Sequence, residues 1–384
     1  MTDASLTFRN GRIFDGTRLL DGHAARFERG HIAAISPDQG GPAKGLEIDL
    51  GGDILFPGFV DLQVNGGDGI LFNTDPSVAT LRRMAKAHRR LGVTAFLPTL
   101  ITDTPEMTHA AISAARDAIK AGVPGIAGLH LEGPHLSVAR KGAHDASLIR
   151  PMDQSDLDTL LKAAESLPLL KATIAPENVT ETQTRTLAAA GVLLSLGHSD
   201  ADFATCQRYF QAGASCVTHL FNAMSQLGNR EPGLVGATLA SGGVSAGLIA
   251  DAIHVHPEAI AAAWRAKTSP GHIFLVSDAM AVAGSAETEF ELGGRAIKRV
   301  NGMLTLSDGT LAGADLELAF AVSTMVNDVG VDLAHALGAA SSVPAKIIGR
   351  NYGFGRLADA VRLSSDLSGI REMTCDQTVS TEAD

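Results

Sequence analysis

Short apolar runs alternate with Ala-rich stretches along the chain from about residue 55 to residue 277. This alternation is typical of repeated βα units. The strands that it predicts are 55–64, 93–98, 126–131, 170–175, 192–196, 215–218, 245–250 and 272–276. Eight β/α repeats in succession favour an α/β fold in which a parallel sheet closes into a TIM-like (β/α)8 barrel, rather than an open sheet.

The segment 77–92 illustrates the helical half of this pattern. Most of its basic residues lie on one side of the expected helix, and the opposite side combines Leu81, Met84, Ala85, His88 and Leu91 at helical spacing. Further helices are predicted at 315–328 and 332–341. A hairpin with an Asn301-Gly302 turn is predicted at 296–309.

The two ends of the chain follow a different pattern. Residues 1–54 contain LTFRNGRIFDG and HAARFERGHIAAISP, alternating runs broken by Gly and Asn that predict antiparallel hairpins. Residues 356–367, RLADAVRLSSDL, predict a strand that returns to this N-terminal unit. We therefore expect a barrel domain at 55–345 and a small β-sandwich domain formed by 1–54 and 346–384, which ends in a loose tail.

Composition narrows the classes of protein further. A chain of 384 residues, 45% of them hydrophobic, can bury a sizeable core without disulfides. The three cysteines, Cys206, Cys216 and Cys375, are too few for a disulfide framework and favour a reducing cytoplasm. Asp3 and Arg9 interrupt any apolar leader, and no apolar run is long enough for a membrane span. The net charge of −11 disfavours nucleic acid and anionic membranes as partners.

Polar residues follow six of the eight expected strands. In a (β/α)8 barrel the active site lies at the carboxyl ends of the strands, and core packing does not explain polar groups there, because burying them unpaired costs a few kcal/mol each. The residues are Asp61, Gln63 and Asn65; His130, Glu132 and His135; His198; His219; Asp251 and His254; and Asp278.

Glu132, His198 and His219 form the first candidate group. One carboxylate and two imidazoles are the ligands of many catalytic zinc sites, in which water fills the open position. Such a metal lowers the pKa of its water and polarises a carbonyl oxygen. The alternative is that each His separately donates to a backbone carbonyl, but three strand ends that supply one coherent set favour the metal.

Asp278 follows the eighth apolar run, in FLVSDAMA. A carboxylate beside the metal could accept a proton from the attacking water and return it to a leaving amine. An Asp in this position could equally be a helix N-cap or a turn residue. The position in the sequence does not separate these two interpretations.

Cationic groups gather in the loops after the third and sixth strands. The first loop, GPHLSVARKGAHD, brings Arg140, Lys141 and His144 together, and the second contains Asn222, Ala223 and Arg230. In an acidic protein such a group suggests an anion site, since Arg binds phosphate well. The alternative is a set of solvated loop charges. The chain has no phosphate-binding loop, no GxSxG nucleophile motif and no cysteine nucleophile motif.

Six segments carry a resemblance to a known family. They are PGFVDLQVNGG (57–67), GLHLEGPHLSVARKGAHD (128–145), SLGHSDA (195–201), THLFNAM with REPG (218–233), GLIADAIHVHP (247–257) and LVSDAM (275–280). In this order they resemble the N-acetylglucosamine-6-phosphate deacetylases of the amidohydrolase superfamily. HLEGP and THLFNAM together are highly specific.

The resemblance implies a metal-dependent hydrolase that converts N-acetyl-D-glucosamine 6-phosphate into D-glucosamine 6-phosphate and acetate. It places the metal ligands at Glu132, His198 and His219 and the catalytic acid/base at Asp278. It further implies a homodimer in which Arg230 reaches the phosphate in the partner subunit's site. The substrate contacts that it implies are His144, Asn222, Ala223, His254 and Arg230.

Strand one departs from the pattern of many amidohydrolases. These carry His-x-His there, whereas this chain has Gln63 and Asn65, and neutral amides are poor zinc ligands. We therefore predict one divalent metal per subunit, zinc with Fe²⁺ as the alternative, and we place Gln63 among the substrate contacts. His144 joins Asp278 as a catalytic candidate, because its imidazole could stabilise the oxyanion.

Three other functions remain as alternatives. A deacetylase of N-acetylgalactosamine 6-phosphate differs by one hydroxyl of the substrate, which spacing cannot distinguish. A cyclic amidohydrolase of the dihydroorotase kind is disfavoured by the missing His-x-His and by a fourth strand without a terminal lysine. A catalytically dead barrel that acts as a binding protein would have no need of the complete set of Glu132, His198, His219 and Asp278.

Overall fold

The computed structural model describes residues 5–41 and 45–373, and its centre is a parallel β-barrel. Successive strands are neighbours throughout its eight-stranded sheet, and a parallel bridge between Val64 and Ala279 joins the last strand to the first. The predicted (β/α)8 fold is therefore confirmed. The strands are β8 (Phe59–Val64), β11 (Val93–Ile101), β12 (Leu129–Glu132), β13 (Leu170–Ile174), β14 (Leu193–Leu196), β15 (Cys216–Val217), β16 (Ser245–Leu248) and β17 (Ile273–Leu275).

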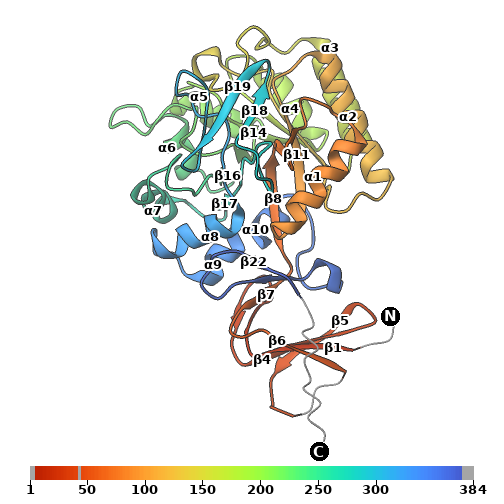
Figure 1. Ribbon diagram of the computed structural model, residues 1–384. Coiled ribbons are helices and arrows are strands. Elements are labelled where there is room, and N and C mark those ends of the chain that lie inside the picture. Colours follow the sequence, from red (N-terminus) through yellow and green to blue (C-terminus); the bar gives the residue numbers. More distant parts are fainter. Residues whose placement is uncertain (1–4, 42–44, 374–384) are drawn as a thin grey trace, which may run out of the picture.

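Helices surround this barrel (Figure 1). The first of them, α1 (Val78–Arg90), begins at Ser77, whose side chain accepts from the backbone N–H of Thr80. It buries Leu81, Met84 and His88, as its spacing predicts. The others are α2 (Pro105–Lys120), α3 (Gln154–Ser166), α4 (Glu181–Ala189), α5 (Phe203–Gln211), α6 (Gly233–Ala240), α7 (Pro257–Ala266), α8 (Leu318–Asn327), α9 (Leu333–Ala339) and α10 (Ser342–Ile347), with short 3-10 turns η1 (Val138–Arg140) and η2 (Leu357–Asp359).

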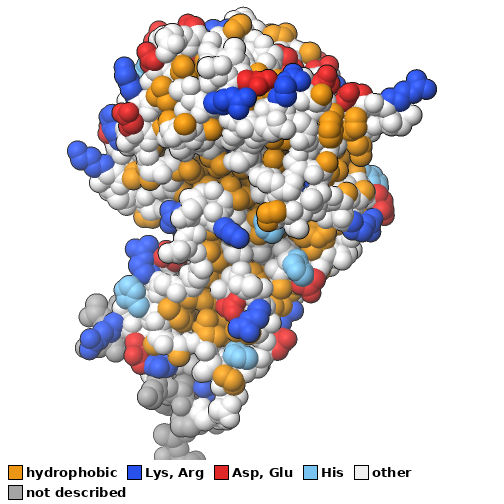
Figure 2. Space-filling model, turned by 180° about the vertical axis from the view of Figure 1, so that it is seen from behind, with side chains coloured by type: hydrophobic (Ala, Val, Ile, Leu, Met, Phe, Trp, Pro, Cys, Tyr) orange, Lys and Arg blue, Asp and Glu red, His pale blue; other side chains and the backbone are white. Residues whose placement is uncertain are grey.

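Two smaller sheets lie below the barrel in Figure 1. One has the order β5 (His31–Pro37), β4 (His23–Glu28), β1 (Leu6–Arg9), β6 (Leu46–Asp49), and the other β22 (Ile370–Arg371), β21 (Val361–Leu363), β7 (Ile54–Phe56), β2 (Arg12–Phe14), β3 (Leu19–Leu20). Phe8 and Phe27 from the first sheet share a buried cluster with Ile13 and Leu55 from the second. The two sheets therefore pack face to face, and Figure 2 shows this smaller unit from behind.

Two details of the N-terminal part differ from the prediction. LTFRNGRIFDG does not form a hairpin, because β1 pairs with β4 and β6 whereas β2 pairs with β3 and β7. The expected strand 55–64 is divided into β7 and β8 at Gly58, whose φ of +88° is unfavourable for other residues. The returning strand is present, since β21 pairs antiparallel with β7. Part of the expected tail, including Cys375, lies outside the described residues.

The mouth of the barrel carries additional strands. The hairpin around Asn301-Gly302 is formed by β19 (Arg295–Val300) and β20 (Met303–Thr305), and β18 (Glu289–Leu292) adds a third strand. A short hairpin of β9 (Gly66–Gly67) and β10 (Ile70–Leu71) follows the first barrel strand. None of the helices in the described ranges is long and apolar enough to cross a membrane.

Candidate active site

Most of the candidate residues meet in a cavity of about 400 Å³ at the carboxyl ends of the barrel strands. Loops after most of the strands contribute to its wall, and the hairpin region at the mouth covers one side. Its lining residues are Asn65, Ile101, Glu132, Ala139, Arg140, Gly142, Ala143, His144, His198, His219, Asn222, Ala223, Ile249, His254, Asp278, Met280, Leu292 and residues 310–313.

Glu132, His198 and His219 form a tight triangle of ligand atoms. Oε1 of Glu132 lies 3.1 Å from Nε2 of each histidine, and the two Nε2 atoms are also 3.1 Å apart. In a tetrahedral zinc site with bonds of about 2.0–2.1 Å, neighbouring ligand atoms are roughly 3.3 Å apart. The spacing of the three atoms therefore fits a single divalent ion.

The hydrogen bonds around His198 strengthen this fit. Its Nδ1 lies 2.8 Å from the carbonyl oxygen of Arg140, which can only accept, so Nδ1 carries the proton. In the neutral ring Nε2 then presents a lone pair toward Glu132 and His219. Burial alone would raise the pKa of Glu132, but hydrogen bonds and positive charge from the two imidazoles in their protonated form hold it well below its usual range. An anionic carboxylate beside a bare ring nitrogen is a suitable environment for a cation.

The backbone at the mouth is strained. His198, His219, Ala223 and Asp278 have φ angles of +48°, +26°, +50° and +50°, in the left-handed region that non-glycine residues rarely adopt. Such conformations persist where the surroundings determine them, and they cluster at functional sites. Here they turn side chains at the strand ends inward.

Asp278 is held by two amides, one in strand β8 and one in the residue that directly follows it. Its Oδ1 accepts from Nδ2 of Asn65 at 2.7 Å and from Nε2 of Gln63 at 3.0 Å. The same Gln63 nitrogen donates to Oε2 of Glu132 at 3.1 Å, so the amide links the two carboxylates. Burial, followed by the charge of Glu132, raises the pKa of Asp278. A carboxylate with a raised pKa is suited to accept and return a proton.

His144 is oriented by Thr102. The backbone N–H of Thr102 donates to Nδ1 of His144 at 3.3 Å, and the Thr102 hydroxyl lies 2.8 Å from the same nitrogen. A backbone N–H can only donate, so the proton of the neutral ring is on Nε2. Burial, with the neighbouring His198, lowers the pKa of His144 to about 3, which keeps the ring neutral. His144 is thus a neutral donor in the wall of the cavity.

A polar group on the other side of the cavity completes the lining. Asn222 and Ala223 follow β15, and His254 follows β16. Nδ1 of His254 lies 2.6 Å from Oδ2 of Asp251, whose Oδ1 also accepts the backbone N–H of His254 at 2.7 Å. Asp251 thereby fixes the proton of His254 on Nδ1, and Nε2 is left for a ligand.

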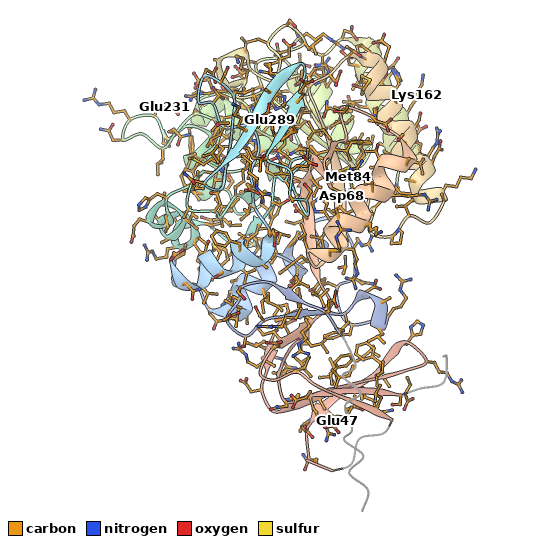
Figure 3. All side chains as sticks on the ribbon, viewed as in Figure 1. Glu47, Asp68, Met84, Lys162, Glu231 and Glu289 are labelled. Carbon is orange, nitrogen blue, oxygen red and sulfur yellow. The ribbon has the colours of Figure 1, made fainter. Side chains whose placement is uncertain are left out.

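Of the two arginines predicted to contribute to an anion site, Arg140 and Arg230, only one lines the cavity. Arg140 lines the cavity, but Asp200 accepts from it at 2.8 Å. Arg230 is not among the lining residues; it is exposed, next to Glu231, on a loop that projects away from the barrel (Figure 3). Within the described chain, the cavity thus has no lining cation without a carboxylate partner.

Other polar strand residues lie outside the cavity. Gln63 is completely buried and uses its amide between the two carboxylates. Asp61 accepts backbone N–H groups inside the barrel, and burial raises its pKa to about 7. His130 lies between the hydroxyls of Thr99 and Thr173.

The sequence did not indicate the roles of two residues that orient side chains of the site, Asn65 and Thr102. Asn65 was identified only as a strand-end residue, and Thr102 was missed because the second strand was expected to end at residue 98, whereas β11 continues to Ile101. The polar Thr102-Asp103-Thr104 that follows this longer apolar run was the available signal.

Comparisons with known proteins agree with this geometry. Residues 54–381 match the Amidohydrolase family. The N-acetylgalactosamine-6-phosphate deacetylase of Shewanella sp. (strain ANA-3) is 44% identical over 316 residues, covering 81% of this chain and 79% of the relative. The N-acetylglucosamine-6-phosphate deacetylase of Homo sapiens is 35% identical over 385 residues, covering 94% and 88%.

Solved structures with the same fold also include deacetylases of phosphorylated amino sugars. The N-acetylglucosamine-6-phosphate deacetylase of Pasteurella multocida superimposes with a TM-score of 0.88 at 34% identity, covering 95% of this chain and 97% of that one. The corresponding enzyme of Mycobacterium smegmatis gives a TM-score of 0.86 at 29% identity, covering 96% and 97%.

Proposed function

Since the chain belongs to the amidohydrolase family, we propose that it removes the acetyl group from N-acetyl-D-glucosamine 6-phosphate, releasing D-glucosamine 6-phosphate and acetate. This reaction serves the catabolism and recycling of amino sugars. The observation that carries the proposal is that Glu132, His198 and His219 share one cavity with Asp278 and His144.

The three ligand residues would hold one divalent metal, zinc by preference, with Fe²⁺ as the alternative. Bound there, the ion would acidify the attacking water and polarise the acetamide carbonyl. The Gln63 amide nitrogen is already engaged by Glu132 and Asp278, so the end of β8 offers Gln63 and Asn65 amides where a second ion would need stronger ligands. Elemental analysis of purified protein should give one tightly bound equivalent per subunit; two would refute the assignment.

The role of each protein side chain in the reaction follows from where its proton lies. Asp278 accepts the proton of the attacking water at its carboxylate and passes it to the amine as the C–N bond breaks. His144 donates from Nε2 to the carbonyl oxygen as negative charge develops on it. The lone pair of His254 Nε2 can accept from a sugar hydroxyl, which would orient the substrate together with Asn222 and the backbone of Ala223.

We propose that the phosphate is bound with the help of a second subunit. Among the described residues, Arg140 is the single Lys or Arg that lines the cavity, and Asp200 neutralises it, whereas Arg230 lies on a projecting loop with Leu227, which is 58% exposed. In a homodimer this loop could place Arg230 in the partner's cavity, where a guanidinium would bind phosphate. The unpaired, buried thiols of Cys206 and Cys216 support a cytoplasmic location.

The galacto epimer is the second candidate substrate. It is favoured by the 44% identity to a protein named N-acetylgalactosamine-6-phosphate deacetylase, which exceeds the 35% identity to the human gluco enzyme. The two sugars differ only in the orientation of one hydroxyl, so the same catalytic residues would serve either.

Acetate release from purified, metal-loaded protein tests these proposals. We expect rapid release from N-acetylglucosamine 6-phosphate and slow release from N-acetylglucosamine, which lacks the phosphate. A higher kcat/KM for N-acetylgalactosamine 6-phosphate would assign the enzyme to the galacto epimer. No release from any of the three by protein with confirmed metal would refute the proposed reaction.

A further inference from the structure

A second cavity lies at the opposite end of the barrel from the catalytic residues. It has a volume of about 640 Å³ and is bounded by the chain that enters β8, by α1, by the start of β11 and by the segment 350–359 that leads back to the smaller β unit. Pro57, Val60 and Val93 belong to its wall, at the amino ends of the first two barrel strands. A volume of this size suits a metabolite-sized ligand.

The cavity is strongly cationic. Five described lining residues are basic, namely Arg82, Lys86, Arg89, Arg350 and Arg356, and one is acidic, Asp359. Asp359 is paired with Arg356 at 3.0 Å. The other four basic residues therefore have no carboxylate partner in the cavity, in a chain whose net charge is −11. Arg82, Lys86 and Arg89 recur at i, i+4 and i+7, so they share one face of α1.

Arg89 provides the sharpest indication of a ligand. Its Nη2 donates to the backbone carbonyls of Ala358 and Ala360, which fixes the guanidinium at the junction of the barrel and the smaller unit. Its Nη1 is buried and has no hydrogen-bond partner among the described residues. A charged donor without a partner is costly to bury, and a small movement of the Arg89 side chain toward the cavity would let an anion accept from it.

We propose that this cavity is a second binding site, for an organic phosphate that carries at least two negative charges and an apolar part. The phosphoryl groups would be bound by Arg89 with Arg82 and Lys86, since guanidinium groups bind phosphate through paired hydrogen bonds. The apolar part would lie against the wall that includes Val60, Val93 and Pro124. The ligand would link α1 to the segment around Ala358 and Ala360.

Calorimetric titration with ADP, and with adenosine as its uncharged counterpart, tests this site. We expect ADP to bind the metal-loaded protein more tightly at low than at high salt, and adenosine to bind at least tenfold more weakly. The double variant Arg82→Gln/Lys86→Gln should weaken ADP binding at least tenfold while deacetylation is retained. Both side chains are exposed, and neither makes a hydrogen bond or an ion pair within the described chain, so the variant should fold.

Two further variants test in which cavity ADP binds. Lys120→Gln/Lys162→Gln removes the same charge from α2 and α3, where Lys162 points away from the barrel (Figure 3), and should leave ADP affinity within twofold. Arg230→Gln should also leave it unchanged. The proposal is overturned if millimolar ADP does not bind, or if affinity is lost in Arg230→Gln and kept in Arg82→Gln/Lys86→Gln, because ADP would then occupy the catalytic cavity. Neither result depends on which sugar is deacetylated.

Discussion

At the scale of single residues, the site is organised by the placement of protons. Gln63 donates to Glu132 and to Asp278, and Asn65 donates to Asp278 as well, so a shared amide holds the two carboxylates close together. In the same cavity, Thr102 directs the His144 proton to Nε2. The arrangement therefore keeps a base and a neutral donor in one cavity.

Replacing Asp278 by Asn should separate catalysis from binding. The amide cannot accept the proton of the attacking water, and a general base contributes about 10²–10⁴-fold to a rate, so kcat should fall by about that factor. Metal content and substrate affinity should be retained, since Asp278 is not one of the three ligand residues. Steady-state kinetics with elemental analysis measures both; turnover near that of the wild type would remove Asp278 from the mechanism.

Replacing Asn65 by Leu should change the pH dependence of the reaction. The hydrogen bond from Asn65 lowers the pKa of Asp278, against the larger effect of burial, which raises it. A hydrogen bond to a charged group contributes about 1.5–3 kcal/mol, and without it the protonated acid is favoured. Since the base must be ionised, the acid side of the kcat/KM profile should move to higher pH. An unmoved profile in protein with normal metal content contradicts this role.

At the scale of elements, a buried histidine fastens α1 to β9, just beyond the active-site end of β8. Nε2 of His88 donates to the carbonyl oxygen of Gly66 at 2.8 Å, and the ring lies 5.5 Å from that of Phe96. Burial lowers the pKa of His88 to about 4, so the folded protein keeps the ring neutral in mildly acidic solution. The unfolded chain, in contrast, takes up a proton near pH 6.5.

His88 should therefore make the protein acid-sensitive. As the pH falls from 6.5 to 4, the unfolded state binds a proton that the folded state does not, which removes up to about 3 kcal/mol of stability. In His88→Gln this contribution is absent, so melting temperatures of variant and wild type should converge or cross as the pH falls. His109→Gln, at an exposed site on α2, is the matched control. A constant difference between His88→Gln and the wild type at all pH values would contradict the expectation.

The sequence predicts a helix or strand well where its pattern of apolar residues also specifies what the element packs against. Apolar runs and helical spacing were sufficient for the barrel, because the strands are largely buried and a helix follows each of them along the chain, although α6 is buried on nearly all sides. The same kind of pattern wrongly predicted that β1 and β2 form a hairpin. Alternation along a strand does not specify which strand it pairs with. Within the site, residue types indicated the Glu-His-His group, but the linking role of Gln63 depends on three-dimensional contacts between residues 63, 132 and 278.

At the scale of the whole molecule, we propose that each catalytic site draws on two subunits. The barrel provides the catalytic groups, while Arg230, the cation suited to the phosphate, does not line the same subunit's cavity and lies on a loop that projects from the barrel (Figure 3). If Arg230 serves the partner, its loss should raise KM with little effect on kcat, because the phosphate is remote from the bond that breaks.

Mixed dimers give the strictest test of this arrangement. Asp278→Asn has inactive sites but intact Arg230, whereas Arg230→Gln has intact catalytic groups but lacks the partner's cation. When the two are unfolded and refolded together, half of the dimers should be mixed, and each should hold one site with both Asp278 and a partner Arg230. At substrate concentrations below KM, activity should recover to about a quarter of the wild-type value, well above either variant alone. If Arg230 acts within its own subunit, mixing leaves every site defective and no recovery occurs.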